Sequence, residues 1–207
     1  MKLPDFFALA PRIAVRDGLA DLLGAAEDGL FEYGYEDAVK LAGHSCPTVA
    51  SAYMLTVHAL RALYPDAVPE RGGVRVEFAK PLDEGVTGVI ASVVMLLSGA
   101  AHDGGFKGIA GRHVRRGLQH FGCDLPLQIR FTRLDTGASV DAATDLSGVP
   151  VDPAMGPLLQ LCIAGRADPA QRRRFAELWQ QRVRLILVDH ADDEHMFRVV
   201  STVGVTS

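Results

Sequence analysis

The chain has 207 residues, 48% of them hydrophobic, and a formal net charge of −4 from 21 Lys and Arg against 25 Asp and Glu. This composition is typical of a globular protein, and the length favours one domain over two independent units. The slight acidic excess supplies no general field that would attract a nucleic-acid backbone, so we expect no nucleic-acid partner.

Targeting and disulfide signals are weak. The longest apolar run, residues 89–97, is much shorter than the about 20 residues that cross a bilayer, so we expect no membrane association. The opening MKLPD has an acid where a signal peptide is positive and then apolar, which favours the cytoplasm. Of the three cysteines, Cys123 and Cys162 are expected to pack as small hydrophobic residues, and no pair has C-x-x-C spacing.

The first third of the chain predicts two helices and a strand. Leucines at helical spacing predict a helix over residues 16–26, and alternation over 30–35 predicts a strand that continues in extended or turn conformation over 37–41. Pro47 suits the first position of a long apolar helix that ends near Tyr64, with Ser45 or Cys46 as its N-cap.

The middle third predicts a strand, a helix and a glycine-rich loop. Residues 74–78 alternate strictly, as in a half-buried strand, and the almost wholly apolar residues 85–97 predict a buried helix, with a strand as the alternative. Five glycines in residues 98–111 predict a loop. We expect this loop to be ordered because Phe106 would be buried against the start of the preceding long helix.

The last third predicts a hairpin over residues 127–133 and 138–144, two helices over 153–164 and 169–187, and a closing strand over 196–202. Helices and strands that alternate irregularly around a hairpin indicate an α+β (mixed α/β) fold.

Three segments are expected to share this fold. We expect an N-terminal helical segment over residues 1–28 and a main domain over 29–147, in which helices flank a central sheet. Residues 148–207 are expected to form a C-terminal extension of helices and a closing strand, packed on the same domain.

Known nucleotide-binding and hydrolase motifs are absent from the sequence. The glycines of residues 98–111 are not followed by Gly-Lys-Ser/Thr, as a Walker A loop requires, and they do not form G-x-G-x-x-G. No G-x-S-x-G nucleophile elbow exists either. The glycines therefore fit tight packing and a ligand site about equally well.

The sharpest local signal is Gly43-His44-Ser45-Cys46-Pro47 at the start of a predicted helix. An imidazole and a thiol two residues apart suit joint ligation of a transition metal, and a helix N-terminus favours the thiolate. Zinc needs further ligands from elsewhere in the chain. The alternatives are a Cys46 that packs and caps the helix, and a thiol enzyme without a metal.

These residues resemble the FmdE-like family, which is named after one of the subunits of formylmethanofuran dehydrogenase. The shared features are His44-x-Cys46-Pro47 opening a helix, an apolar helix that leads into Ser98-Gly99-Ala100, and a Lys107-Gly108 loop, within about residues 29–145. The resemblance implies a mixed α/β domain, a homodimer, and a metal near the His-x-Cys turn. The namesake of the family accompanies a molybdenum or tungsten oxidoreductase.

This chain differs from the family pattern at ligand positions. Ala42 stands where the family has its first histidine, and Ala100 stands where it has a cysteine. The Cys-rich zinc-binding tail of many members has no counterpart here. The resemblance therefore implies His44 and Cys46 as metal ligands and Lys107 as a ligand-binding loop residue.

Other residues are weaker candidates for the same site. Glu77 lies in a predicted strand where family members often have an acid, which suggests it as a metal ligand. His102 and Asp103 follow Ala100 and offer a replacement imidazole and carboxylate, His102 for the metal and Asp103 for a bound ligand. Arg112 begins an arginine-rich run whose guanidinium groups favour an anionic ligand. An exposed loop histidine and a solvated helix face are the alternatives.

These observations predict a metal-binding protein, with zinc the expected metal and nickel the next. We expect it to be an enzyme or an accessory subunit in molybdenum- or tungsten-type oxidoreductase metabolism, acting on a small anionic ligand. The alternative is a non-catalytic, chaperone-like subunit with a degenerate metal site. The expected partners are a second copy of the chain and a larger oxidoreductase subunit.

Overall fold

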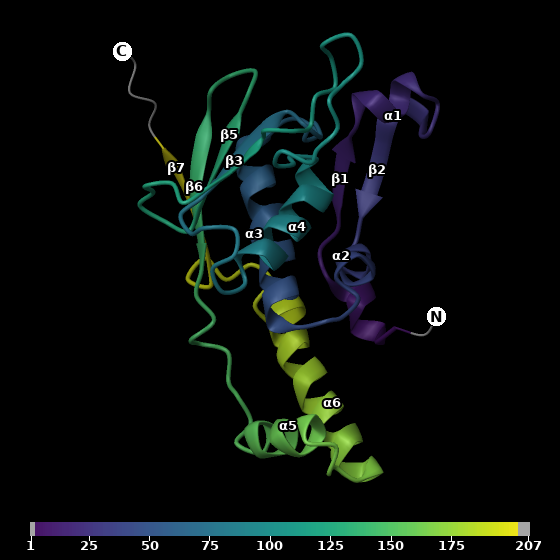
Figure 1. The fold of residues 1–207 in the computed structure, drawn as a ribbon, viewed down its shortest axis with the longest axis vertical. Coiled ribbons are helices and arrows are strands. Elements are labelled where there is room, and N and C mark those ends of the chain that lie inside the picture. The colour runs from purple at the N-terminus through teal and green to yellow at the C-terminus, as the bar shows by residue number, and fades with distance from the viewer. Residues whose placement is uncertain (1–2, 203–207) are drawn as a thin grey trace.

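The computed structural model describes residues 3–202, which form an α+β fold of six α-helices and two sheets (Figure 1). The helices are α1 (Gly18–Leu22), α2 (Tyr35–Ala42), α3 (Pro47–Leu63), α4 (Thr87–Ser98), α5 (Met155–Ile163) and α6 (Pro169–Arg184). The strands are β1 (Ile13–Arg16), β2 (Leu30–Tyr33), β3 (Val74–Phe78), β4 (Gln119–Phe121), β5 (Ile129–Arg133), β6 (Ser139–Thr144) and β7 (Phe197–Thr202). Among these described residues, no helix has the length and apolar character to cross a membrane.

The larger sheet has five strands in the order β4-β3-β5-β6-β7. Strand β4 is parallel to β3, and the other neighbours are antiparallel. On β3 the side chains of Val74, Val76 and Phe78 are buried, whereas the alternate residues Arg75 and Glu77 are partly exposed. Helix α3 packs against β5, β6 and β7, and in Figure 1 the helices lie to one side of this sheet. The other face therefore carries the polar side chains.

Helix α3 is the centre of the hydrophobic core. Val49, Met54 and Val57 have no exposed surface, and the sheet and α4 both pack on this helix. The core cluster includes residues from Phe7 to Phe197, so the beginning and the end of the described chain share it with the middle.

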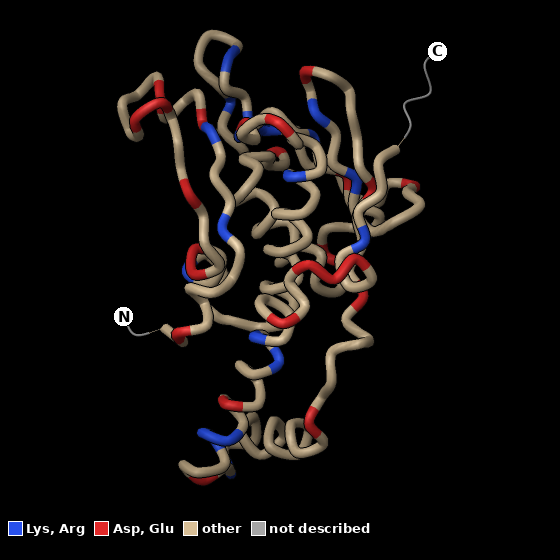
Figure 2. Tube along the Cα trace, turned by 180° about the vertical axis from the view of Figure 1, so that it is seen from behind, with Lys and Arg blue, Asp and Glu red and all other residues tan. Residues whose placement is uncertain are grey.

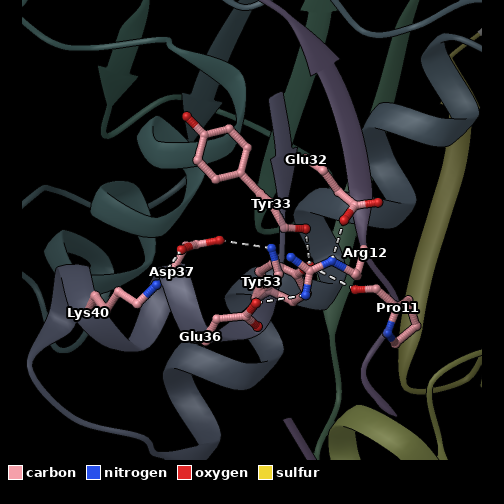
Figure 3. A network of polar contacts seen from close by, with 9 residues as sticks. Pro11, Arg12, Glu32, Tyr33, Glu36, Asp37, Lys40 and Tyr53 are labelled. Atoms are coloured by element: carbon pink, nitrogen blue, oxygen red, sulfur yellow. Dashed lines mark hydrogen bonds and ion pairs between the residues drawn. The ribbon is translucent and has the colours of Figure 1, made fainter. Parts of the chain in front are cut away.

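Polar contacts fasten the small β1–β2 sheet to α2 and α3 (Figure 3). The buried Tyr53 hydroxyl lies 2.7 Å from the carbonyl oxygen of Pro11 and 3.1 Å from that of Tyr33. Arg12 donates to Glu32 and Glu36, both at 2.7 Å. These hydrogen bonds to Glu36 and Glu32 raise the pKa of the Arg12 guanidinium above its usual value.

The prediction of extended structure over residues 37–41 is wrong, because these residues lie in α2. Asp37 accepts a hydrogen bond from the backbone N–H of Gly34 at 3.0 Å, which satisfies a free donor at the helix start. Gly43 ends the helix in the left-handed conformation, with φ 73°. The strand that precedes α2 is also shorter than predicted and ends at Tyr33.

The expectation of an N-terminal helical segment over residues 1–28 holds only in part, because their described part contains a 3-10 helix at Asp5–Leu9 but also strand β1. Asp17 caps α1, which has only five residues, and strand β1 precedes it and pairs with β2. The leucines whose spacing predicted a longer helix, Leu22 and Leu23, are 62% and 65% exposed. They have no core to face, so periodicity alone did not extend the helix.

Most of the other elements match the predictions. Strand β4 was not predicted, because its three residues pair with β3 and have too short a pattern of their own. Helix α6 continues into a π-helical turn at Leu185–Asp189, which accounts for its predicted end. The long helix, the apolar helix, the hairpin, the two C-terminal helices and the closing strand are confirmed as α3, α4, β5–β6, α5 and α6, and β7.

Candidate functional site

The turn that carries His44 and Cys46 links α2 to α3. Cys46 is the N-cap of α3, and its Sγ accepts a hydrogen bond from the backbone N–H of Val49 at 3.4 Å. The exposed His44 ring has Nδ1 3.0 Å from the carbonyl oxygen of Ala42. Because a carbonyl oxygen only accepts, Nδ1 donates this hydrogen bond, and in the neutral ring Nε2 is the nitrogen with a lone pair. The turn thus offers one nitrogen donor and one sulfur donor.

Ser45, between these two residues, ties the turn to α2 and α6. Its Oγ lies 2.9 Å from the Tyr35 hydroxyl and 2.9 Å from Gln180 Oε1, and its carbonyl oxygen accepts from Trp179 Nε1 at 2.9 Å. Burial raises the pKa of the Tyr35 hydroxyl well above its usual value, so this group stays protonated. No local pattern predicts these contacts, because Trp179 is 134 residues further along the chain.

The predicted ligands His102 and Asp103 do not join His44 and Cys46. Thr48 at the start of α3 and Val86 at the start of α4 line the same cavity, so the two helices begin at the same end of the molecule. The loop that carries His102 and Asp103 leaves the far end of α4 (Figure 1). Helix α4 has 12 residues, and a helix of that length spans about 18 Å, so the loop lies well away from the turn with His44 and Cys46.

Glu77 is also remote from the turn, for a different reason. Its neighbours Val76 and Phe78 point into the core, so the alternation of a strand directs Glu77 to the opposite face of the sheet. There its carboxylate lies 3.5 Å from Arg75. Within residues 3–202 no group of three or more His, Cys, Asp and Glu residues is placed to hold a metal ion. The four-residue ligand set His44, Cys46, Glu77 and His102 is therefore not assembled.

Backbone hydrogen bonds, and not burial of Phe106, link the glycine-rich loop to the rest of the chain. The carbonyl oxygen of Phe106 accepts from the N–H of Arg115 at 2.9 Å, but its ring is 43% exposed, so the expected burial is wrong. Gly108 has φ 87°, and a Cβ there would lie 2.4 Å from the carbonyl oxygen of Arg112. The glycine is needed for this close approach of backbone segments.

The proposed ligand-binding residues Asp103, Lys107 and Arg112 are exposed on this loop. None of them lines any of the four main cavities of the described chain. Arg112 bonds to Ile109 through its backbone, which makes a local turn. None of these four cavities therefore brings the three residues together.

A buried ion cluster at the base of the loop was missed by the sequence analysis. Asp17 is 6% exposed, and its two carboxylate oxygens lie 2.6 Å from Arg115 and 2.7 Å from Arg71. The same carboxylate accepts from the backbone N–H groups of Leu19 and Ala20. Burial lowers the pKa of Arg115, and the charge of Asp17 opposes that change. The burial of Arg115 depends on the negative charge of Asp17, because an unpaired buried charge is costly.

The largest of these four cavities opens between the start of α4 and the ends of the sheet strands. Its volume is about 640 Å³, and its walls are mostly apolar. A second cavity, of about 190 Å³, shares with it the lining residues Val86, Ile90, Gln128 and Ile129, so the two adjoin. The second cavity reaches the first turns of α3 at Thr48 and Ser51.

Few polar groups line the larger cavity. Lys80 and Glu84 form an exposed ion pair with Nζ and Oε1 2.6 Å apart. The Gln128 amide is used internally, because it bonds to both the N–H and the carbonyl oxygen of Thr144 at 3.1 Å. These residue types are common and widely spaced in the sequence, so no motif could have marked the cavity.

Comparison with protein-family models gives no match, and comparison with curated proteins gives none either. The resemblance to the FmdE-like family therefore rests on the sequence motifs alone and stays a prediction.

Proposed function

We propose that this protein binds a small, largely apolar molecule in the cavity between α4 and the strand ends. The observation that supports this proposal is the size and apolar lining of the cavity. Its volume of about 640 Å³ falls within the roughly 300–1,000 Å³ of typical small-molecule sites, which are also mostly apolar with a few polar groups. The smaller adjoining cavity lengthens the space toward α3.

The walls indicate how such a ligand is oriented. Phe78 and Ile129 belong to the buried inner face of the sheet, so they favour an apolar part of the ligand. Lys80 and Glu84 are at the exposed side, where their side chains are 65% and 50% exposed. A ligand with an apolar body and one polar or charged group fits this distribution. The polar or charged group of the ligand would take the place of Lys80 or Glu84 as the partner of the other residue.

Narrowing the cavity should weaken binding. Ile90 is half-buried and lines both cavities, so Ile90→Trp places an indole in the shared space. Titration with the fluorescent apolar anion anilinonaphthalene sulfonate should show saturable binding to the wild type. We expect the dissociation constant to rise at least about tenfold in Ile90→Trp, which corresponds to about 1.4 kcal/mol.

Val89→Trp is the matched control, because Val89 lies on the same helix, is 36% exposed and lines neither cavity. It should bind the probe like the wild type. The proposal fails if the wild type shows no saturable binding, or if Ile90→Trp and Val89→Trp bind equally well.

A second candidate function is binding of one transition-metal ion at His44 and Cys46. The observation that favours it is the hydrogen bond from His44 Nδ1 to the Ala42 carbonyl oxygen. This bond leaves Nε2 as the ring nitrogen that can bind a metal. This arrangement is common for metal-binding histidines. Nitrogen and sulfur donors suit zinc or nickel, but a structural zinc site uses four donors. The remaining positions would be left to water or to another molecule, so the affinity should be modest.

Cobalt titration tests this second candidate, because a thiolate bound to cobalt gives a charge-transfer absorption band. We expect stoichiometric uptake by the wild type and loss of the band in Cys46→Ser. Cys162→Ser is the control, since Cys162 lies on α5, away from the turn. A wild-type protein that takes up no cobalt, zinc or nickel shows that Cys46 only caps α3.

Action on a small anionic ligand at Asp103, Lys107 and Arg112 stays a prediction; none of these residues lines one of the four cavities named above. Association with a larger molybdenum or tungsten oxidoreductase stays a prediction. Neither cavity binding nor metal binding at the turn depends on it.

A further inference from the structure

Strand β7 is an open edge of the larger sheet. Within the described residues it pairs with β6 alone, and no strand lies beyond it (Figure 1). Its six residues, FRVVST, include no proline and no lysine, and Val200 is 42% exposed. The opposite edge strand, β4, has only three residues. Short length, proline and lysine usually protect an edge from pairing with another chain, so β4 is protected and β7 is not.

Alternate backbone groups of β7 point away from β6. In an antiparallel pair, every second residue directs both its N–H and its C=O to the neighbouring strand. The carbonyl oxygen of Met196 accepts from the N–H of Asp145 at 2.9 Å, which assigns the even-numbered residues of β7 to the β6 side. The N–H and C=O groups of Val199 and Ser201 therefore face the open edge.

A cavity lies beside this edge, between β7 and α3. Its volume is about 420 Å³, and its lining includes His58 and Ala62 of α3, Glu194 of the preceding loop, and residues 197–200 of β7. The His58 ring stacks on Phe197 with the ring centroids 5.3 Å apart. Side chains alternate along a strand, so a strand added to β7 would direct one of its side chains toward α3 and into this cavity.

The loop before β7 is acidic. Residues 189–194 include four acidic side chains, and the loop is a red stretch in Figure 2. The ion pairs of the described chain leave two of these, the exposed Asp192 and Glu194, without a cation. Arg198, the only lysine or arginine of the cavity wall, follows the buried Phe197, so its side chain lies on the other face of the sheet. The charge beside the cavity is therefore negative and favours a basic partner.

We propose that β7 binds an extended segment of another protein as an added strand. An apolar side chain of this segment fills the cavity, and a lysine or arginine of it lies beside Glu194. The open N–H and C=O groups of Val199 and Ser201 supply the backbone hydrogen bonds. In this mode of recognition, strand addition gives affinity, and pockets for alternate side chains give specificity. The site shares no lining residue with the cavity beside α4.

A phage-displayed library of random short peptides tests the open edge. Ser201→Pro removes an outward N–H and no bond to β6, so peptides that also bind this variant bind elsewhere and are discarded. Ser201→Ala keeps the N–H and should bind the remaining peptides like the wild type. We expect these peptides to combine alternating apolar residues with lysine or arginine. The proposal is overturned if no peptide remains.

Two further variants test the cavity and the charge. Ala62→Trp fills the cavity from an exposed position on α3, and Glu194→Lys reverses the charge beside it. Each should raise the dissociation constant of a selected peptide at least about tenfold. Ala170→Trp and Glu27→Lys are the matched controls, because both positions are exposed and line none of the four cavities, and they should bind like the wild type. Wild-type affinity in either Ala62→Trp or Glu194→Lys overturns the proposal.

Amide hydrogen exchange followed by NMR reports the added strand directly. In the free protein, the N–H groups of Val199 and Ser201 should exchange faster than those of Arg198 and Val200, which face β6. Binding of a selected peptide should slow the exchange of Val199 and Ser201. Unchanged exchange in the complex overturns the proposal. Protection of both groups in the free protein also overturns it, because this chain or a second copy would then cover the edge.

Discussion

Replacing Asp17 with alanine should lower the free energy of unfolding by about 3–5 kcal/mol, the usual cost of removing one partner from a buried ion pair. Asp17 is 6% exposed, and its carboxylate forms ion pairs with both Arg71 and Arg115, at 2.7 and 2.6 Å. Without it, two poorly solvated guanidinium groups would be left side by side. Urea unfolding monitored by circular dichroism measures the effect.

Two further variants separate the contributions of Asp17. Asp17→Asn keeps an oxygen that can accept from the N–H groups of Leu19 and Ala20 but removes the charge, so its loss of stability reports the ion cluster without the helix cap. Asp21→Ala removes a half-exposed carboxylate 3.5 Å from Arg16 and should cost at most about 0.5 kcal/mol. Equal effects for Asp17→Ala and Asp21→Ala would show that the cluster contributes no special stability.

Phe131→Ala should lower the free energy of unfolding by about 3–5 kcal/mol, because it removes a large ring from the packed core. Phe131 has no exposed surface and lies on β5, the middle strand of the larger sheet. Its cross-strand neighbours are Val76 and Val140, which are also buried. The cavity left behind would be lined from both sides by rigid strands, so it cannot collapse easily.

Urea unfolding measures this effect too, with Leu134→Ala as its control. Leu134 follows β5 directly but is 50% exposed, so its truncation should change stability by less than about 0.5 kcal/mol. Phe131→Leu, which keeps most of the apolar contact, should fall between the two. A Phe131→Ala protein as stable as Leu134→Ala would contradict the placement of the core.

The sequence was most informative where a local pattern and burial agree. The α+β class, the long helix α3 and the β5–β6 hairpin followed from apolar spacing, a proline at a helix start and a turn. It failed at α1, where the leucine spacing is helical but Leu22 and Leu23 face solvent. It failed again at α2, where Asp37 and Gly43 start and end a helix that the apolar pattern did not reveal.

The features of the candidate site also fall into those that the sequence alone determines and those that only the fold determines. The sequence by itself determined that a thiol and an imidazole stand together before α3, because residues two apart in a turn are neighbours in any fold. Only the tertiary structure decided that Glu77 and His102 lie elsewhere, since strand alternation and the length of α4 separate them from the turn. The cavity beside α4 and the contact of Asp17 with Arg115, 98 residues apart, exist only because distant segments pack together. Local sequence patterns carry no information about such distances, so these features appear only in the folded chain.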